Sequence, residues 1–527
     1  MNTLILLFLF VVVEAHRPLR ILINSPTVGY SHVAFHGQLA DLLADAGHEV
    51  HFHIPTWEAK EKRNGTRKAH KVVRISATIE PQDTTKLNVD DHELNRNPFE
   101  TKETGNGDNS EEYLNAILAF CKMQMEDRDY LNSIVSEKFD VAIAEQMDVC
   151  AFYFFHLANI PTTLTTSTMI SSFGMVAEAY GLETRLSYQA GGMCFSSTEM
   201  PNLSFLERVR NIYRTLTVCS VIKSFENKAQ SLFSDHFSRP MPSFTQLLGK
   251  TVYAFVNSAE ALEHVQPITR KIRPIGGITL NLRTPNRLSA ELENIYANAD
   301  RGVVLLSFGS NIESNLMRKE LKFEVLRSFA RFPNFQFIWR ISVDSETAEM
   351  ISQVPNVHPI SWVDQRAILA DNRTKLFISH CGANSVLEAA FEGVPVIAVP
   401  FFNDQFSNSG LLLSRKTAVL LRRDDINEEN LVAALNRTLN NPQFLSNAQN
   451  LKNRMRLHPE QPQESFVRYV EYAAAFDHSD LDLPSKKMSF MVLYNLDIYT
   501  AVFGIFLVIF LTIYKLFSSI KQKLKTE

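Results

Sequence analysis

The chain has 527 residues, with 53 Lys plus Arg against 57 Asp plus Glu and a formal net charge of -4. This length predicts two to three domains, while 45% hydrophobic and 21% charged residues exclude a disordered chain. The near-neutral charge argues against a nucleic-acid partner, and five scattered cysteines argue against a disulfide scaffold or a zinc site.

The first residues, 1–15, predict a cleaved signal peptide. The apolar run Leu4–Val13 is too short to cross a bilayer, and Ala15 is a small residue suited to cleavage. The alternative, a buried first strand, is less favoured because the next apolar segment, Arg20–Asn24, already supplies a strand.

Residues 16–280 predict an N-terminal Rossmann-like domain. The strand Arg20–Asn24 is followed by a loop, by a helical pattern that ends at Gly47, and by a second strand, Glu49–Ile54. This β-loop-α-β order is typical of a doubly wound parallel sheet. The polar, acidic stretch 81–112 predicts a mobile insertion or loop. Further strands are predicted at Phe139–Ala144 and Thr251–Asn257.

Residues 281–300 predict a linker, and residues 301–455 predict a second Rossmann-like domain. This half restarts with an apolar strand, Val303–Ser307, followed by the turn Gly309–Asn311 and a helix through Leu326. Two such α/β domains, facing each other, leave a cleft at the carboxyl ends of their strands, where ligands of this architecture bind. Further strands are predicted at Phe335–Arg340, Lys375–Ser379 and Val394–Pro400.

The C-terminal part predicts a membrane anchor. We expect residues 456–490 to form a helical segment that packs back on the two domains, and residues 496–514 to form a transmembrane helix. Ile498–Tyr514 holds no charged residue, and its length of about 25 Å suits the thinner endoplasmic reticulum bilayer of roughly 27 Å. Residues 515–527 form a lysine-rich tail of the kind left in the cytosol.

These features together predict a single-pass type I protein of the endoplasmic reticulum membrane, with its body in the lumen. The last five residues, Lys523–Glu527, are similar to the dilysine retrieval signal of resident reticulum membrane proteins, although lysine-rich tails also bind anionic lipid. Four Asn-X-Ser/Thr sequons agree with a lumenal body. They begin at Asn64, Asn202, Asn372 and Asn436.

The segment 362–405 concentrates the polar residues of a nucleotide site. A predicted strand, Lys375–Ser379, and a tight turn at Gly382 lead into a helix that begins near Asn384. The free N–H groups and the positive dipole end at this helix start can bind phosphate. Glu388 lies one turn further on the same helix face as Asn384, where a carboxylate can bind ribose hydroxyls.

This segment resembles the signature of the UDP-glycosyltransferases, the GT-B-fold enzymes that include the animal glucuronosyltransferases, and the resemblance covers nearly the whole chain. For the donor, it implies a base stack on Trp362, a nucleoside hydrogen bond to Gln365 and a ribose contact at Glu388. It also implies that Asp404 and Gln405 bind hydroxyls of the transferred sugar. The pyrophosphate would be held by His380, Gly382, Asn384, Ser385 and Ser310.

Two positions depart from the family pattern. Asp364 stands where a proline usually precedes the glutamine, and Cys381 stands where animal members often carry glycine. Neither departure removes a contacting side chain.

A candidate general base, His32, follows the first strand. Transfer to a hydroxyl requires a base that works near neutral pH, and histidine fits. A helix cap or a satisfied polar group is the plainer interpretation of this histidine. The resemblance favours catalysis, because the family's catalytic histidine precedes a Gly-His pair by the interval that separates His32 from His48. His36 is the local alternative, expected to line the acceptor pocket or to pack.

The family pairs this histidine with an aspartate after a strand that contains Asp-Val, but here Glu145 follows the strand. A glutamate can accept the imidazole Nδ1 proton and stabilise the imidazolium, although its extra methylene changes its reach. Asp148 is the alternative. A metal site built on histidines such as His51 and His53 is not favoured, because no carboxylate or cysteine has ligand spacing with them.

The resemblance implies an inverting glycosyltransferase that moves glucuronate or glucose from a UDP-sugar to a small lipophilic hydroxylated acceptor. It implies no metal cofactor, because the helix N-terminus and His380 meet the charge on the leaving diphosphate. Two alternatives stay open: glycosylation of a membrane lipid such as a sterol or ceramide, and a non-catalytic nucleotide-sugar-binding partner of active relatives. The sequence does not distinguish glucuronate from glucose, and it leaves a homo- or hetero-oligomer open.

Overall fold

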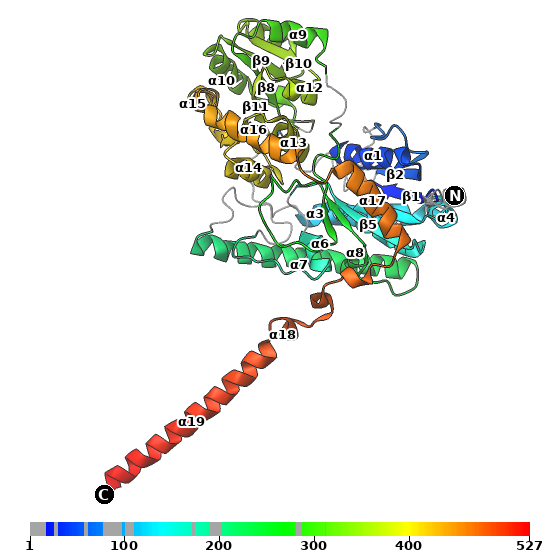
Figure 1. Cartoon of the computed structure of the whole chain (residues 1–527), viewed down its shortest axis with the longest axis vertical. Helices are drawn as coiled ribbons and strands as arrows, with labels where there is room; N and C mark the ends of the chain where they lie inside the picture. Colours follow the sequence, from blue (N-terminus) through cyan, green and yellow to red (C-terminus); the bar gives the residue numbers. More distant parts are fainter. Residues whose placement is uncertain are drawn as a thin grey trace, which may run out of the picture.

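The computed structural model describes residues 17–25, 30–56, 62–76, 97–100, 110–170, 174–189, 203–280, 287–310 and 312–526. The predicted signal peptide, the sequon residue Asn202 and most of the predicted 81–112 insertion lie outside these ranges. Within them the chain forms two α/β lobes and a long helix that extends away from the N-terminal lobe, which is the lower of the two in Figure 1.

The N-terminal lobe is built on a parallel sheet of seven described strands. β1 pairs with β2 so that Arg20 lies opposite Glu49, and its other four residues are buried, as expected of a parallel strand covered on both faces. The strand order reverses between β1 and β4, and ligands of open α/β sheets bind at such a point. Across the sheet the strands are β3 (Lys71–Ser76), β2 (Glu49–Thr56), β1 (Arg20–Asn24), β4 (Val141–Glu145), β5 (Thr162–Ser167), β6 (Ala254–Val256) and β7 (Ile272–Pro274).

Helices connect these strands and cover the sheet (Figure 1). The longest, α7, starts with a capping box in which the Ser204 side chain accepts from the Glu207 backbone and the Glu207 side chain accepts from the Ser204 backbone. The helices of this lobe are α1 (Tyr30–Asp45), α3 (Ser110–Glu126), α4 (Arg128–Ser136), α5 (Val149–Leu157), α6 (Gly174–Ala179), α7 (Phe205–His236) and α8 (Phe244–Gly249).

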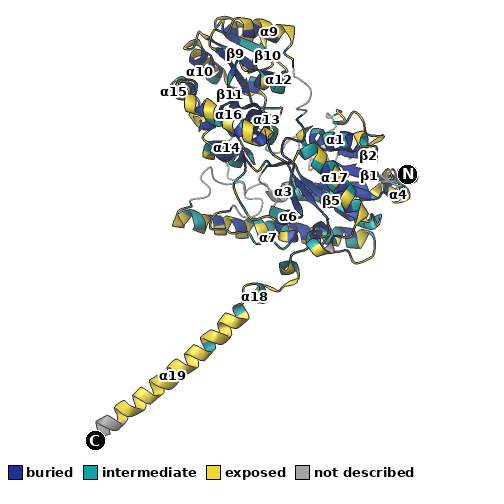
Figure 2. Cartoon of the chain, viewed as in Figure 1, coloured by how far each residue is buried: buried dark blue, intermediate teal, exposed yellow. Residues whose placement is uncertain are grey.

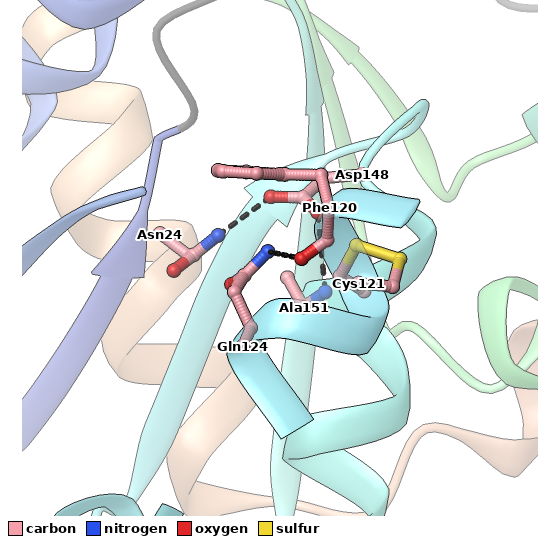
Figure 3. The surroundings of a disulfide bond; sticks show 7 residues. Asn24, Phe120, Cys121, Gln124, Asp148 and Ala151 are labelled. Atoms are coloured by element: carbon pink, nitrogen blue, oxygen red, sulfur yellow. Dashed lines mark hydrogen bonds between the residues drawn. A yellow bond between two sulfur atoms is a disulfide. The ribbon is translucent and has the colours of Figure 1, made fainter. Parts of the chain in front are cut away.

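A disulfide joins Cys121 of α3 to Cys150 in the first turn of α5 (Figure 3). Asp148 caps the same helix, because its carboxylate accepts from the Ala151 backbone N–H at 3.1 Å and from the Asn24 amide at 2.6 Å. No sequence pattern indicated this cross-link. Its cysteines are 29 residues apart and meet only because two helices pack together.

The C-terminal lobe is built on a second parallel sheet, of six described strands. Its central strand, β8, is buried over all six residues, and the order again reverses beside it, between β8 and β11. The strands across the sheet are β10 (Val357–Ile360), β9 (Phe335–Arg340), β8 (Gly302–Ser307), β11 (Thr374–Ser379), β12 (Val396–Ala398) and β13 (Ala418–Leu420). The helices are α9 (Ala290–Ala297), α10 (Lys319–Ala330), α11 (Ser345–Ser352), α12 (Gln365–Ala370), α13 (Ala383–Glu392), α14 (Gln405–Ser414), α15 (Glu428–Leu439) and α16 (Pro442–Arg456).

The prediction of two Rossmann-like α/β lobes is confirmed by these sheets. Several predicted elements have other bounds in the structure: the strand predicted at 139–144, for example, is β4 at Val141–Glu145. The strand predicted at 251–257 is the three-residue β6, and the strand predicted at 394–400 is the three-residue β12. The helix after the β8 turn begins only at Lys319, because a short 3-10 turn at Ser314–Leu316 precedes it.

After the C-terminal lobe the chain returns to the N-terminal lobe. Helix α17 (Pro462–Ala475) places Phe466 in edge contact with Phe255 of β6, with ring centroids 4.9 Å apart. Phe466 and Val470 are fully buried in the same apolar cluster as the β1 and β2 side chains. The last helix of the globular body therefore completes the core of the first lobe.

The chain then runs through a short helix, α18 (Phe490–Leu493), into α19 (Leu496–Thr526). Within the described residues, one helix is long and apolar enough to cross a membrane: the candidate span is Leu496–Gln522, and an 18-residue window within it has a mean hydropathy of 2.3. Figure 2 shows α19 exposed and apart from the lobes. The candidate span runs eight residues beyond the predicted end at 514, and the added turns carry Lys515 and Lys521.

Candidate active site

The candidate catalytic residues meet at the carboxyl ends of the N-terminal strands. His32 lies in the first turn of α1, and Glu145 is the last residue of β4. The His32 Nδ1 lies 2.5 Å from the Glu145 Oε2. The other carboxylate oxygen, Oε1, accepts from the Thr168 hydroxyl at 2.5 Å and from its backbone N–H at 3.2 Å. Both oxygens of a buried glutamate are thus bonded, and one of them holds the imidazole.

Charge couples the two residues strongly. Burial alone lowers the pKa of His32, but the negative charge of Glu145 and their hydrogen bond raise it above its ordinary value. Burial raises the pKa of Glu145, but the His32 charge and hydrogen bond outweigh it and lower that pKa to about 2. Glu145 therefore stays ionised and stabilises an imidazolium on His32.

The two local alternatives have other partners. His36 is buried, with its Nδ1 at 2.9 Å from the His32 carbonyl and its Nε2 at 2.8 Å from the Thr166 hydroxyl. Burial lowers its pKa to about 4, so this ring stays neutral and packs. Asp148 is the cap of α5, and burial raises its pKa to about 6. The carboxylate that contacts His32 is that of Glu145.

Three of the predicted donor residues meet at the start of α13. The Gln365 amide donates to the Ser385 hydroxyl at 3.0 Å and to the Glu388 carboxylate at 2.5 Å. Burial raises the pKa of Glu388 to about 7. Asp364, in the position where the family usually has proline, caps α12 by accepting from the Ala367 backbone N–H at 3.0 Å. This departure from the family pattern thus has a structural role beside Gln365.

His380 fits between two glycines. A Cβ on Gly309 would lie 2.6 Å from the His380 ring, and a Cβ on Gly382 would collide with its Nε2. Gly309 also has a positive φ of 73°, which favours glycine. Burial lowers the pKa of His380 to about 3, so the ring is neutral. Among the described residues its Nδ1 is buried without a hydrogen-bond partner, which is uncommon for a buried polar atom.

The turn after β11 is strained at Cys381. This residue has a positive φ of 63° and a fully buried side chain. A left-handed backbone costs a non-glycine residue roughly 1–2 kcal/mol. The glycine that family members often carry at this position would adopt the same conformation without that cost. Asn384, the second residue of α13, is half-buried beside this turn.

Trp362, the residue for which the resemblance implies a base stack, is exposed: 62% of its surface is accessible. The Arg340 guanidinium lies over its indole ring, 5.3 Å from the ring centroid, and Arg340 also donates to the Gly309 carbonyl. Arg340 thereby links the indole to the turn that carries the exposed Ser310. No sequence motif pointed to this arginine. The one sequence feature that could have indicated it is its position, because Arg340 is a single charged residue at the carboxyl end of the apolar strand β9.

Asp404 and Gln405 lie at the start of α14, on the side of the C-terminal lobe that faces His32. The Asp404 carboxylate accepts from the Asn408 amide at 2.8 Å, burial raises its pKa, and its charge raises the pKa of His32. Gln405 is buried, and its side-chain oxygen accepts from the Phe401 backbone N–H at 2.8 Å. The structure therefore brings residues of both lobes to one site.

Thr168 was also missed by the sequence analysis. It directly follows β5, and the Asn257 side chain, after β6, donates to its backbone carbonyl at 3.0 Å. A polar residue at the end of a strand next to β4 was the available signal. In the described part of the chain, no group of three or more His, Cys, Asp or Glu side chains is placed to hold a metal ion. Of the predicted glycosylation sites, Asn64, Asn372 and Asn436 are exposed.

Comparisons with known proteins agree with this geometry. The family model for UDP-glucuronosyl and UDP-glucosyl transferases matches residues 21–526. A putative UDP-glucuronosyltransferase of Caenorhabditis elegans, ugt-50, is 26% identical over 95% of both chains. Human UDP-glucuronosyltransferase 3A2 is 26% identical over 85% of this chain and 83% of its own. Among solved structures, Medicago truncatula UGT71G1 complexed with UDP-glucose has a TM-score of 0.58 and 16% identity over 88% of this chain and 99% of its own.

Proposed function

The chain belongs to the UDP-glucuronosyl and UDP-glucosyl transferase family, and from this we propose an inverting enzyme that transfers glucuronate or glucose to a small lipophilic acceptor with a hydroxyl group. Hexosyl transfer from a UDP-sugar is the activity of the family. The observation that carries the proposal is the pair His32 and Glu145, 2.5 Å apart, whose charge is coupled to Asp404 of the other lobe.

The proposed reaction is a single displacement. His32 removes the proton of the acceptor hydroxyl, and the oxygen forms a bond to the anomeric carbon of the sugar. The bond from that carbon to the diphosphate breaks on the opposite face, and its electron pair leaves with UDP. The proton stays on His32, where Glu145 stabilises it, and then passes to water.

The donor is proposed to lie along the C-terminal lobe. Trp362 stacks on uracil with the face that Arg340 does not cover, Gln365 binds the nucleoside, and Glu388 binds the ribose hydroxyls. The sugar hydroxyls bind Asp404 and Gln405. Phosphate oxygens bind the N-terminus of α13, with its residues Gly382, Asn384 and Ser385, together with His380 and Ser310.

The charge of the leaving diphosphate needs a cation or dipoles nearby. His380 is neutral because burial lowers its pKa to about 3, so it contributes an N–H rather than a charge. The α13 N-terminus supplies oriented dipoles, and Arg340, whose positive charge already acts on His380, supplies the cation. On this basis we propose that the reaction proceeds without a metal cofactor.

The proposed location is the endoplasmic reticulum membrane, with both lobes in the lumen. The candidate span α19 and the lysine tail support an anchored protein. The Cys121–Cys150 disulfide suits an oxidising compartment, and three sequon asparagines are exposed to a glycosylating enzyme.

The test is a donor panel with the purified full-length chain. UDP-glucuronate, UDP-glucose and other UDP-sugars are each incubated with phenolic and sterol acceptors, and UDP release and product mass are measured. The expected product carries the β-anomer, read from its NMR coupling constant, and His32→Ala gives none above background. An α-linked product, or full activity of His32→Ala, would contradict the proposed mechanism. Product on sterols alone would identify a membrane-lipid glycosyltransferase instead.

A further inference from the structure

The first three turns of α7 expose large apolar side chains. Along the helix, Phe205, Val209, Ile212 and Leu216 follow one another at intervals of four, three and four residues, which places them on one face. Two more exposed apolar residues lie beside them. We call the whole set the α7 stripe; its members are Phe205, Leu206, Val209, Ile212, Tyr213 and Leu216.

The opposite side of the same turns is polar and points inward. Asn211 is buried and its side-chain amide donates at 2.7 Å to the carbonyls of Leu186 and Gln189. Thr215, one turn on, is buried as well. A surface helix of a globular protein normally buries its apolar face and exposes its polar face. In these turns the arrangement is reversed, which marks an interaction surface.

The charge of this segment is positive. Arg208, Arg210 and Arg214 alternate with the stripe, and Glu207 is the one acidic residue between 205 and 216. An apolar helix face flanked by arginines is typical of helices that lie in the headgroup layer of a membrane, because the cations reach anionic lipid phosphates.

The membrane anchor is fixed beside this helix. Lys486 donates to the Gly249 carbonyl at the end of α8 at 2.6 Å, and the Ser485 hydroxyl donates to the Gly181 carbonyl at 2.5 Å. Helix α8 is joined to α7 by the Thr245 hydroxyl, which donates to the Glu226 carboxylate at 2.6 Å. In Figure 1, α7 runs along the edge of the lobe from which the chain leaves toward α19.

This fixed point limits the distance to the bilayer. Leu496, where α19 begins, is ten positions beyond Lys486, and an extended chain spans at most about 3.5 Å per residue. The membrane surface therefore lies within roughly 35 Å of the Lys486 contact. The N-terminal lobe is therefore the lobe nearest to α19 along the chain, and α7 lies along the edge from which the chain leaves toward that helix.

We propose that the α7 stripe lies in the headgroup layer of the bilayer that α19 crosses, so that the N-terminal lobe is held on the membrane at two places. The occupant of the stripe is phospholipid, with the apolar side chains about 5–10 Å below the phosphates and the three arginines at the phosphate level. This docking is independent of the proposed reaction.

The test uses the full-length chain reconstituted in vesicles of phosphatidylcholine and phosphatidylserine. A polarity-sensitive fluorophore is attached at Leu216→Cys, in a background where the exposed free Cys219 and Cys194 are changed to serine. A matched control carries the fluorophore at Phe323→Cys, an exposed apolar residue of α10 in the other lobe. Lipids brominated in the acyl chains serve as quenchers.

Bromolipid is expected to remove about half or more of the emission at position 216, since that depth lies at the headgroup and acyl boundary, and to leave position 323 unchanged. Val209→Glu with Ile212→Glu should restore the emission at 216 without unfolding the protein, because both side chains are exposed. Equal emission at 216 with and without bromine would overturn the proposal. If unlabelled Leu216→Cys chains then cross-link to each other, the occupant is a second copy.

Discussion

Replacing Glu145 with glutamine should lower the maximal kcat/KM and should also move the acidic limb of its pH profile to lower pH. His32 accepts a proton only when it is neutral, so kcat/KM rises with pH through the His32 pKa. Glu145 raises that pKa. In Glu145→Gln the negative charge is gone, burial dominates and the pKa falls, so the acidic limb of the profile moves to lower pH. At the same time the plateau falls, because the imidazolium formed in the transition state is no longer stabilised.

The size of the loss follows from the geometry. Nδ1 and Oε2 are 2.5 Å apart, and the Glu145 side chain is 4% exposed, so solvent screens the pair weakly. Two unit charges whose centres are about 4 Å apart attract by about 4 kcal/mol at an effective dielectric constant of about 20. At about 1.4 kcal/mol per tenfold change, this is up to about 10³-fold in kcat/KM.

The assay is UDP release across a pH series with saturating acceptor, for the wild type and two variants. Asp148→Asn is the matched control: asparagine also caps helices, and this carboxylate does not contact His32, so the acidic limb and plateau should stay close to those of the wild type. An unchanged plateau in Glu145→Gln, or an acidic limb that moves to higher pH, would refute the assignment of Glu145 as the partner of His32.

Three further outcomes are expected. Trp362→Ala should weaken UDP inhibition about 10- to 100-fold, since stacking contributes about 1–3 kcal/mol per base, while Trp362→Phe should keep most of the affinity. If the wild type and Trp362→Ala had equal inhibition constants for UDP, Trp362 would not be the residue that stacks on the base. The affinity for a UDP-sugar, whose diphosphate does not change charge near neutral pH, should rise with pH through about 7, where Glu388 ionises and accepts from ribose hydroxyls more strongly. This dependence should vanish in Glu388→Gln. Cys121→Ala with Cys150→Ala should cost about 3–4 kcal/mol of unfolding free energy for a loop of this size, seen as a lower melting temperature that reductant no longer affects.

The sequence predicted the fold well because parallel α/β lobes have a strong signature. Buried strands such as β8 are continuous apolar runs, and a strand-turn-helix at α13 leaves its glycine and polar residues in a recognisable order. The bounds of β6 and β12 were predicted too long. The residues that flank them, such as Tyr253 before β6 and Val399 after β12, are buried although they lie outside the strands. A sequence pattern detects burial and does not show where strand pairing ends.

Contacts between distant segments account for what the sequence missed in the site. His32 and Glu145 are 113 residues apart, and a single sequence says nothing of whether a glutamate's extra methylene fits. Thr168 and Arg340 join the site only because neighbouring strands end at one edge. The Cys121–Cys150 bond likewise depends on how α3 packs on α5.

Because α17 packs on the first lobe, that lobe is built from two separate stretches of the chain, one before and one after the second lobe. A fragment that ends at the inter-lobe linker lacks Phe466 and Val470, which pack in the same apolar cluster as Phe255. Such a fragment would expose the apolar side chains of this cluster to water. Chimaeras that exchange the second lobe between relatives should therefore keep residues 462–475 with the first lobe. Joining residue 280 to this helix through a new linker would give the first lobe as a self-contained protein.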